Sequence, residues 1–262
     1  MYGWYLGPLD VEVRAADAPW FPLGCRERPE RGHAKLTIEL TAHTAPPASE
    51  EYAQIQEWTA VGCRIVARRT IVEIDWQAAT ARWSWPIPES AYAQQDLRSS
   101  TALATLLALA LRHGGVLLHG TSLTRGDDAV VASGPSGAGK STLARRFHGR
   151  YLHDDTTLIM PSETGWQVWF QDIHRAGPGK HVDQARLKRL FSIDRDRSIT
   201  AKRRLSVGDG LQQLLEQTYY ATPWATQQLT GNLINLLEGV PCYALTHCLA
   251  SPLHVLECVL WD

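Results

Sequence analysis

The chain has 262 residues, a formal net charge of −1 at pH 7 and a hydrophobic fraction of 44%, values typical of a soluble globular protein of one large or two smaller domains. A charge so close to zero gives no overall field that attracts nucleic acid or an acidic membrane, so we expect neither as a partner. The five cysteines are odd in number and scattered, which favours a reducing cytoplasm over a disulfide framework.

Residues 1–97 are expected to form a β-rich region. Its first residues lack the cationic segment of an export signal. Strands are predicted at 35–40, in the β-branched run 64–75, and at 80–85, which alternates polar and apolar residues and returns against the preceding strand. Residues 45–49 are predicted as a loop. The region contains no phosphate loop, metal-ligand spacing or nucleophile motif, so a recognition role and a structural role both stay open.

A second domain is expected over residues 98–262, beginning with a helix at 99–112 that has a serine cap and a Leu/Ala face. Its apolar run is far shorter than the roughly 20 residues that a membrane span needs, so we predict a buried helix. A short buried strand follows at 116–119. The turn at 125–128 then leads into the strand 129–132, which is predicted to pair with its predecessor as an antiparallel hairpin.

The next segment, GPSGAGKS at 134–141, fits the phosphate-binding loop pattern G-x-x-x-x-G-K-[ST] at every fixed position. The glycines let backbone N–H groups converge on a phosphate chain, and the start of the following helix favours the same anion. Lys140 is expected to reach the β- and γ-phosphates, and the Ser141 hydroxyl to bind Mg²⁺. The predicted nucleotide-binding residues are Gly134, Pro135, Ser136, Gly137, Ala138, Gly139, Lys140, Ser141 and Thr142.

Two acidic residues, Asp154 and Asp155, follow a short predicted strand. Asp154 lies 14 residues after Lys140, which leaves room for one helix and one strand, so both carboxylates are expected beside the loop. One could hold the metal while the other takes a proton from an attacking hydroxyl. His119 ends the strand beside the loop strand and could assist proton transfer or bind an anion. The alternatives are a solvated turn for the aspartates and a structural hydrogen bond for the histidine.

The order of these segments resembles the catalytic domain of HPr kinase/phosphorylase. The close likeness covers about residues 115–160 and rests on VLLHG at 116–120, the loop 134–141 and LHDD at 152–155. A weaker likeness at 229–245 is to HPr-kinase-related proteins found beside peptide-modification enzymes. The family groups with phosphoenolpyruvate carboxykinases. The resemblance therefore implies an α/β fold with a P-loop kinase core on a mixed, largely antiparallel sheet, preceded here by the β-rich region.

The resemblance implies roles only where residues match. Lys140 and Ser141 match the phosphate and metal residues, and His119 matches the strand histidine. The acidic pair matches one that includes the family's general base. The family's later EIRGLGI segment is missing here, although Asp172 could replace its glutamate at the metal. This difference counts against HPr as the substrate and against a phosphorylase reaction. It favours a divergent kinase of the type of the lasso peptide kinases, which phosphorylate a serine of a biosynthetic peptide.

Two further features lie toward the C-terminus. Residues 186–204 are rich in arginine and lysine, and we consider both a solvated helix and loop and a mobile segment that clamps phosphates or peptide carboxylates. The clamp candidates are Lys180, Arg203 and Arg204. Cys242 lies near His247 and Cys248 without zinc-finger spacing, so buried, inert thiols are expected there. A hairpin is also predicted from strands at 156–160 and 166–170.

Together these features predict an ATP- and Mg²⁺-dependent kinase that transfers the γ-phosphate to a serine or threonine hydroxyl of a peptide or protein. One alternative is a small-metabolite kinase, which the long β-rich prefix and the hairpin before the loop disfavour. The other is a non-catalytic nucleotide-binding switch or assembly module. The sequence is compatible with a homo-oligomer.

Overall fold

The structure is a computed structural model, and the chain divides into two compact units. The first unit holds the described residues up to Leu109, and the second holds those from Ala110 onwards, except that helix α4 (Pro223–Gly239) groups with the first unit up to Thr226. The division therefore falls inside helix α1 (Ala91–Arg112), as does the predicted boundary after residue 97. The described residues are 2–6, 9–14, 35–42, 54–67, 69–86, 90–147, 151–153, 155–169, 184–194, 200–218, 223–246 and 251–262.

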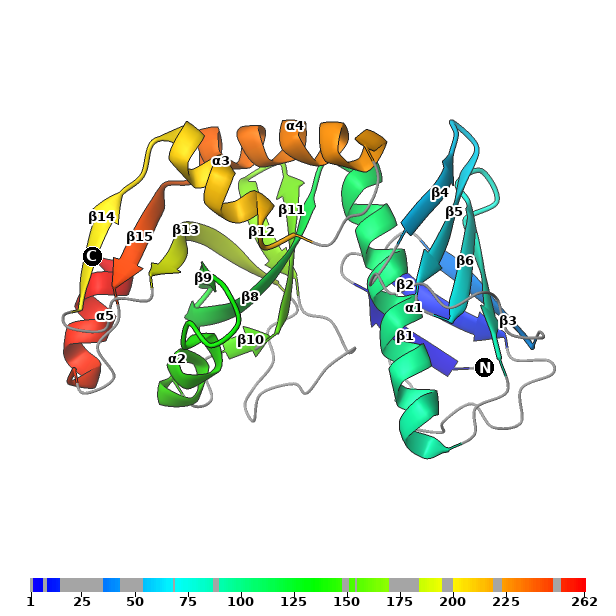
Figure 1. Ribbon diagram of the computed structural model, residues 1–262, viewed down its shortest axis with the longest axis horizontal. Coiled ribbons are helices and arrows are strands. Elements are labelled where there is room, and N and C mark those ends of the chain that lie inside the picture. Colours follow the sequence, from blue (N-terminus) through cyan, green and yellow to red (C-terminus); the bar gives the residue numbers. More distant parts are fainter. Residues whose placement is uncertain are drawn as a thin grey trace. The chain divides into compact units, whose positions relative to one another are not determined.

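The first unit is built on one seven-stranded sheet (Figure 1). Its strands are β1 (Tyr2–Leu6), β2 (Leu9–Arg14), β3 (Lys35–Ala42), β4 (Gln54–Trp58), β5 (Gly62–Ala67), β6 (Thr70–Asp75) and β7 (Thr80–Trp85). They follow the order β1-β2-β3-β7-β6-β5-β4, with β3 parallel to β2 and β7 and the other pairs antiparallel. The predicted strand at 35–40 and the return of 80–85 against its predecessor are confirmed. The run 64–75 forms two antiparallel strands, and the Thr70 hydroxyl closes their turn by donating to the Ala67 carbonyl at 2.7 Å.

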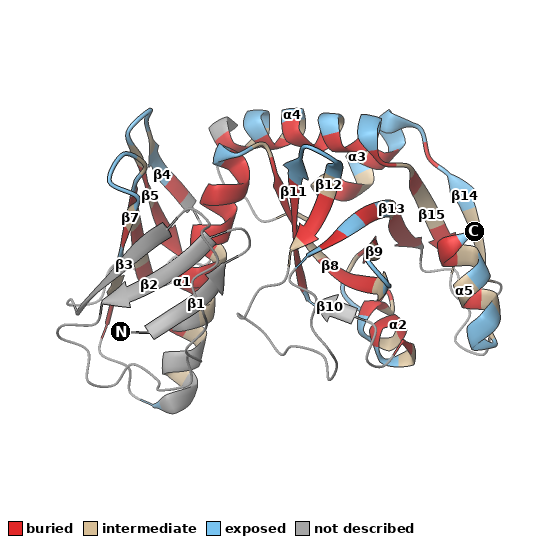
Figure 2. Ribbon diagram, turned by 180° about the vertical axis from the view of Figure 1, so that it is seen from behind, coloured by how far each residue is buried: buried red, intermediate tan, exposed pale blue. Residues whose placement is uncertain are grey.

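Helix α1 begins earlier than predicted. The Ser90 hydroxyl, rather than Ser99 or Ser100, accepts the capping hydrogen bond, from the backbone N–H of Ala93 at 3.1 Å. Ser100 is instead buried inside the helix. The part of α1 in the first unit packs on the sheet, since the indole Nε1 of Trp83 donates to the Thr105 hydroxyl at 3.0 Å. Figure 2 shows the buried residues that β5, β7 and α1 contribute to this core.

The second unit contains an eight-stranded sheet. Its strands are β8 (Val116–Arg125), β9 (Asp128–Ser133), β10 (Tyr151–His153), β11 (Thr156–Ser162), β12 (Gly165–Trp169), β13 (Gln184–Asp194), β14 (Ala201–Arg204) and β15 (Cys242–Thr246). The order is β10-β8-β11-β12-β13-β15-β14, and β9 pairs with both β8 and β13, so that five of the strands close a ring. β13 is parallel to β9 and β15, and the other pairs are antiparallel. The fold is thus mixed α/β with largely antiparallel sheets.

Both hairpins predicted in this unit are confirmed. β8 and β9 pair antiparallel, with Gly120 opposite Ser133, and β11 and β12 pair antiparallel across a turn at 163–164. The pairing of β8 with β9 requires a glycine at position 120. A Cβ atom there would lie 2.9 Å from the carbonyl oxygen of Ala132, closer than packed atoms approach.

Helices cover both sides of this sheet. Figure 1 shows α3 (Val207–Leu215) and the second-unit part of α4 along one side, and α2 (Lys140–Arg146) and α5 (Leu253–Trp261) along the other. A single hydrophobic cluster joins α2 and α5 to the sheet: Leu123, Val130, Ala132, Ala138, Leu143, Phe147, Phe191, Ile193, Leu245, Leu256, Leu260 and Trp261. No described helix combines the length and the hydropathy that crossing a membrane requires.

The basic run 186–204 does not form the helix that one interpretation assumed. Its described residues belong mainly to strands β13 and β14. Alternation explains the first part of β13, since Ala185 and Leu187 are buried while Arg186 and Lys188 are exposed. After a shift of register, residues 190–193 are all buried, Ser192 among them.

Candidate functional site

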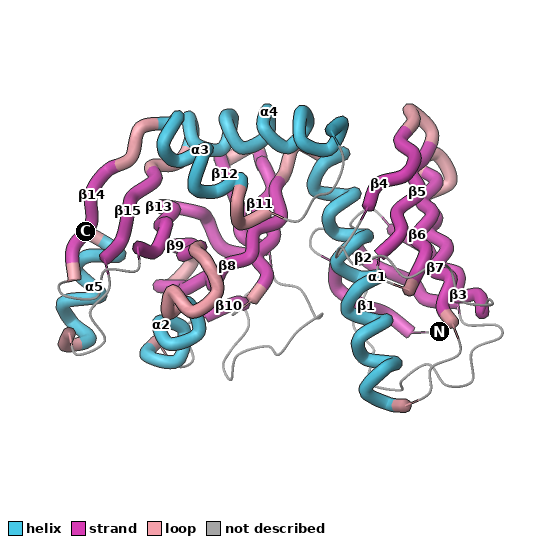
Figure 3. The backbone as a smooth tube through the Cα atoms, viewed as in Figure 1, coloured by secondary structure: helices cyan, strands magenta, loops and turns pink. Residues whose placement is uncertain are grey.

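The glycine-rich loop, residues 134–139, connects β9 to α2 (Figure 3). It leaves the sheet directly after Ser133 and turns back on itself, with the backbone N–H of Ala138 donating to the Pro135 carbonyl at 3.1 Å. Gly139 precedes the helix with φ 107°, a left-handed conformation that residues with a Cβ rarely adopt. This glycine therefore allows the chain to enter α2 directly from the turn.

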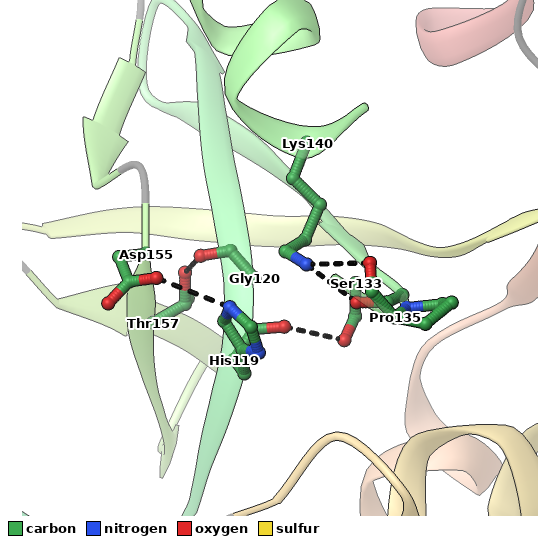
Figure 4. A network of polar contacts seen from close by, with 8 residues as sticks. His119, Gly120, Ser133, Pro135, Lys140, Asp155 and Thr157 are labelled. Carbon is green, nitrogen blue, oxygen red and sulfur yellow. Dashed lines mark hydrogen bonds and ion pairs between the residues drawn. The ribbon is translucent and has the colours of Figure 1, made fainter. Parts of the chain in front are cut away.

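Lys140 is the first residue of α2, and its side chain folds back over the loop. The ammonium Nζ donates to the carbonyls of Gly134 at 2.6 Å and Pro135 at 3.2 Å (Figure 4). Only 6% of the residue's surface is exposed. A buried ammonium needs such acceptors because burial without them is costly. The charge of Lys140 is thus fixed at the base of the loop.

His119 and Asp155 face one another across neighbouring chain segments. The imidazole Nε2 of His119 lies 3.2 Å from the carboxylate Oδ1 of Asp155, and the two side chains are 33% and 57% exposed. His119 belongs to β8, whereas Asp155 directly precedes β11 (Figure 4). The backbone N–H of the next residue, Gly120, donates to the Asp155 carbonyl at 3.0 Å, so a backbone hydrogen bond also joins the two chain segments beside this pair.

Three further hydrogen bonds fix the end of the histidine strand. The backbone N–H of His119 donates to the Gln217 carbonyl at 2.7 Å, and its carbonyl accepts the buried Ser133 hydroxyl at 2.9 Å. The buried Thr157 hydroxyl donates to the Gly120 carbonyl at 3.0 Å. Because Ser133 also begins the turn into the loop, the histidine and the loop share one rigid base.

These side chains open onto one cleft of about 360 Å³. Three separate parts of the chain line it, namely β8, the loop with α2, and the residue before β11. The lining residues are His119, Ser136, Gly137, Gly139, Lys140, Ser141, Thr142, Arg145 and Asp155. The structure therefore brings together six of the nine predicted loop residues, the strand histidine and one of the two predicted aspartates, whereas Gly134, Pro135 and Ala138 do not line the cleft. Asp154, Asp172 and Lys180 lie outside the described residues.

Arg203 and Arg204 do not line this cleft. They belong to β14, which β13 and β15 separate from β9 in the sheet. The guanidinium carbon of Arg204 lies 5.7 Å from the ring centre of Tyr243, and the Lys202 ammonium lies 5.3 Å from the same ring. Lys202 and Arg204 therefore contact an aromatic side chain of the adjacent strand β15.

Arg145 lines the cleft but was not selected from the sequence. The signal was present, because Arg145 lies four residues after Ser141 in the predicted helix and so on the same helical face. Composition drew attention to the longer basic run instead. Arg145, close to the motif, lines the cleft, whereas Arg203 and Arg204 of the run 186–204 do not.

The buried thiols agree with the expectation of inert cysteines. Burial raises the pKa of both Cys63 and Cys242 to about 12. His247 and Cys248 lie outside the described residues. In the described part of the chain, no three His, Cys, Asp or Glu side chains are grouped as metal ligands.

Comparison of the chain with protein-family models and with curated proteins finds no match.

Proposed function

We propose that this protein is an ATP- and Mg²⁺-dependent kinase that phosphorylates a serine or threonine hydroxyl of a peptide or protein. One observation carries the proposal. The lysine of a phosphate-loop motif, a strand histidine and a distant aspartate line the same cleft. A glycine-rich loop with no chemical role would not need His119 and Asp155 to converge on it.

The loop supports phosphate binding in two ways. Lys140 lies at its base, and its ammonium donates to two of the loop's own carbonyls. Phosphate oxygens are stronger acceptors for a cation than neutral carbonyls, so a bound nucleotide would compete for this ammonium. The hydroxyls of Ser141 and Thr142 line the same space and can donate to further phosphate oxygens.

The donor set also fits Mg²⁺. This ion prefers oxygen ligands and usually takes one or two carboxylates together with substrate phosphates and water. Ser141 supplies a hydroxyl to the cleft lining, and the predicted acidic pair of Asp154 and Asp155 would supply the carboxylate. When bound, the ion would neutralise charge on the phosphates.

Among the described residues, Asp155 is the best-placed acceptor for the proton of the substrate hydroxyl, and Asp154 would then be the carboxylate that holds the metal. Its carboxylate is more than half exposed toward solvent, and His119 holds one of its oxygens. In the transfer, the hydroxyl oxygen bonds to the γ-phosphorus, its proton passes to the carboxylate, and ADP leaves with the electrons of the broken P–O bond. His119 orients the carboxylate during this step.

The likeness to HPr kinase/phosphorylase supports a protein or peptide acceptor. The loop strand β9 arrives from an antiparallel hairpin, an arrangement that agrees with this likeness rather than with parallel-sheet metabolite kinases. The P-loop kinase core and the family assignment are part of the proposal.

The test is phosphoryl transfer by the purified protein with Mg²⁺ and γ-labelled ATP. Serine-containing peptides and small hydroxyl metabolites are offered in parallel, with Lys140→Ala as the control. We expect label on a peptide serine or threonine and none with the variant. Label on a metabolite alone would replace the acceptor, and nucleotide binding without transfer to any acceptor would favour a switch.

A further inference from the structure

Arg145 is the residue of α2 furthest along the helix that lines the cleft. Helix α2 starts at Lys140, directly after the loop (Figure 3). Arg145 lies four residues beyond Ser141, about 6 Å further along the axis at 1.5 Å per residue. Both residues are exposed and both line the cleft. The cleft thus continues along the helix, past the loop.

The hydrogen bonds of Arg145 leave donors for a ligand. Its Nε donates to the Ser141 carbonyl at 3.1 Å, which directs the guanidinium along the cleft side of α2. Among the described residues, its two Nη groups have no hydrogen-bond partner and no acidic neighbour. The adjacent Arg146 differs, because its Nη2 donates to the Ser251 carbonyl at the start of the C-terminal helical segment.

We propose that Arg145 binds the phosphate chain of the nucleotide on the side away from the reacting phosphate, and thereby sets nucleotide affinity rather than turnover. The inference rests on the proposed function. His119 and Asp155 mark the reacting end, at the base of the loop. The nucleoside side of the chain then extends along α2, where a guanidinium can pair with two phosphate oxygens at once.

This placement predicts a particular kinetic pattern. Contacts that are equally strong in the ground state and the transition state change affinity without changing the rate of the bound complex. Loss of a charged hydrogen-bonding partner should weaken both ATP and ADP about tenfold to hundredfold. The turnover number at saturating ATP should stay within about twofold of the wild-type value.

The test is calorimetric titration with ATP and with ADP, both with Mg²⁺, of the wild type, Arg145→Ala and Arg145→Lys. Arg69→Ala is the matched control, because Arg69 is an exposed arginine at the turn before β6 in the first unit. We expect Arg145→Ala to weaken both nucleotides equally, Arg145→Lys to weaken them less, and Arg69→Ala to change neither.

Unchanged ATP and ADP affinities in both Arg145 variants would overturn this inference but leave the proposed function standing. A loss for ATP but not ADP, together with a lower turnover number, would also overturn it, because it would put Arg145 at the reacting phosphate. A wild-type protein that binds neither nucleotide would overturn the proposed function and this inference together.

Discussion

The two units use their polar side chains differently. In the first unit, the described polar contacts serve the fold, as when the Trp83 indole donates to Thr105 inside the core or when Arg64 and Arg82 approach Glu73 at 3.9 Å on the surface. In the second unit, Lys140, His119 and Asp155 converge on a cleft. The two sheets are of similar size, but the polar side chains named in the first unit contact other parts of the fold, whereas those named in the second unit line a cleft.

The largest expected effect comes from the loop lysine. ATP at 100 times its dissociation constant should stabilise the wild type by about 2.7 kcal/mol, or about 5–10 °C in Tm. Lys140→Ala should abolish this shift because it removes the ammonium at the base of the loop. Thermal denaturation with and without Mg²⁺ and ATP provides the measurement. An undiminished shift in the variant would remove the loop from nucleotide binding.

The acidic residues should affect turnover more than stability. Asp155→Asn keeps the shape of a largely exposed side chain but removes its basicity, so Tm should change little while phosphoryl transfer falls about 100- to 10,000-fold. Asp154→Asn tests the second predicted carboxylate in the same way. Rates of transfer at saturating ATP, compared with Tm, separate the two effects. Near-normal transfer by both variants would exclude these carboxylates from the mechanism.

Gly120→Ala should damage the base of the site through the fold. The added methyl would lie 2.9 Å from the backbone oxygen of Ala132, so β8 and β9 must separate, at a cost of about 1–3 kcal/mol. Chemical denaturation measures this loss. We expect weaker ATP binding as well, because the same hairpin holds His119 and the start of the loop. Wild-type stability would show that the strands lie further apart than described.

A substitution in the core of the first unit should lower stability without changing ATP binding. Thr105→Val removes the hydroxyl that accepts the Trp83 hydrogen bond, which should cost about 1 kcal/mol of unfolding free energy. Its ATP dissociation constant should equal that of the wild type. Denaturation and ATP titration of the same preparation make the comparison, and a changed dissociation constant would contradict the assignment of nucleotide binding to the second unit.

The smallest effect concerns the cysteines. Because burial raises the pKa of Cys242 to about 12, this thiol stays protonated at pH 8 and should resist alkylation, whereas the exposed Cys258 should react. Peptide mapping after iodoacetamide treatment measures both positions. Rapid labelling of Cys242 in the folded protein would mean that β15 opens easily.

The sequence predicted the parts of this fold that depend on local pattern. Alternation and turn residues identified both hairpins around the loop, and the phosphate-loop motif located the start of α2. The start of α1 was predicted too late, because several serines compete as caps and sequence alone does not decide among them. The closing of β9 against β13 was also not predicted, since it joins segments more than 50 residues apart.

For the site too, local spacing was predicted from the sequence, whereas long-range proximity was not. Spacing from Lys140 correctly suggested that an aspartate returns to the loop, and Asp155 lines the cleft. The many basic residues of the run 186–204 suggested Arg203 and Arg204. The number of basic residues in a segment does not say how far they lie from the loop, and in the sheet β13 and β15 separate β14 from the loop strand β9. Arg145 could have been predicted from the helical repeat, because it lies one turn after Ser141 in the helix that the motif begins.

The most direct test of the central claim is a crystal structure with Mg²⁺ and a non-hydrolysable ATP analogue. The account predicts the triphosphate in the cleft, with its terminal phosphate beside His119 and Asp155 and with the Lys140 ammonium turned from the Gly134 and Pro135 carbonyls toward phosphate oxygens. An analogue bound elsewhere on the protein, or a cleft that stays empty at saturating analogue, would contradict it.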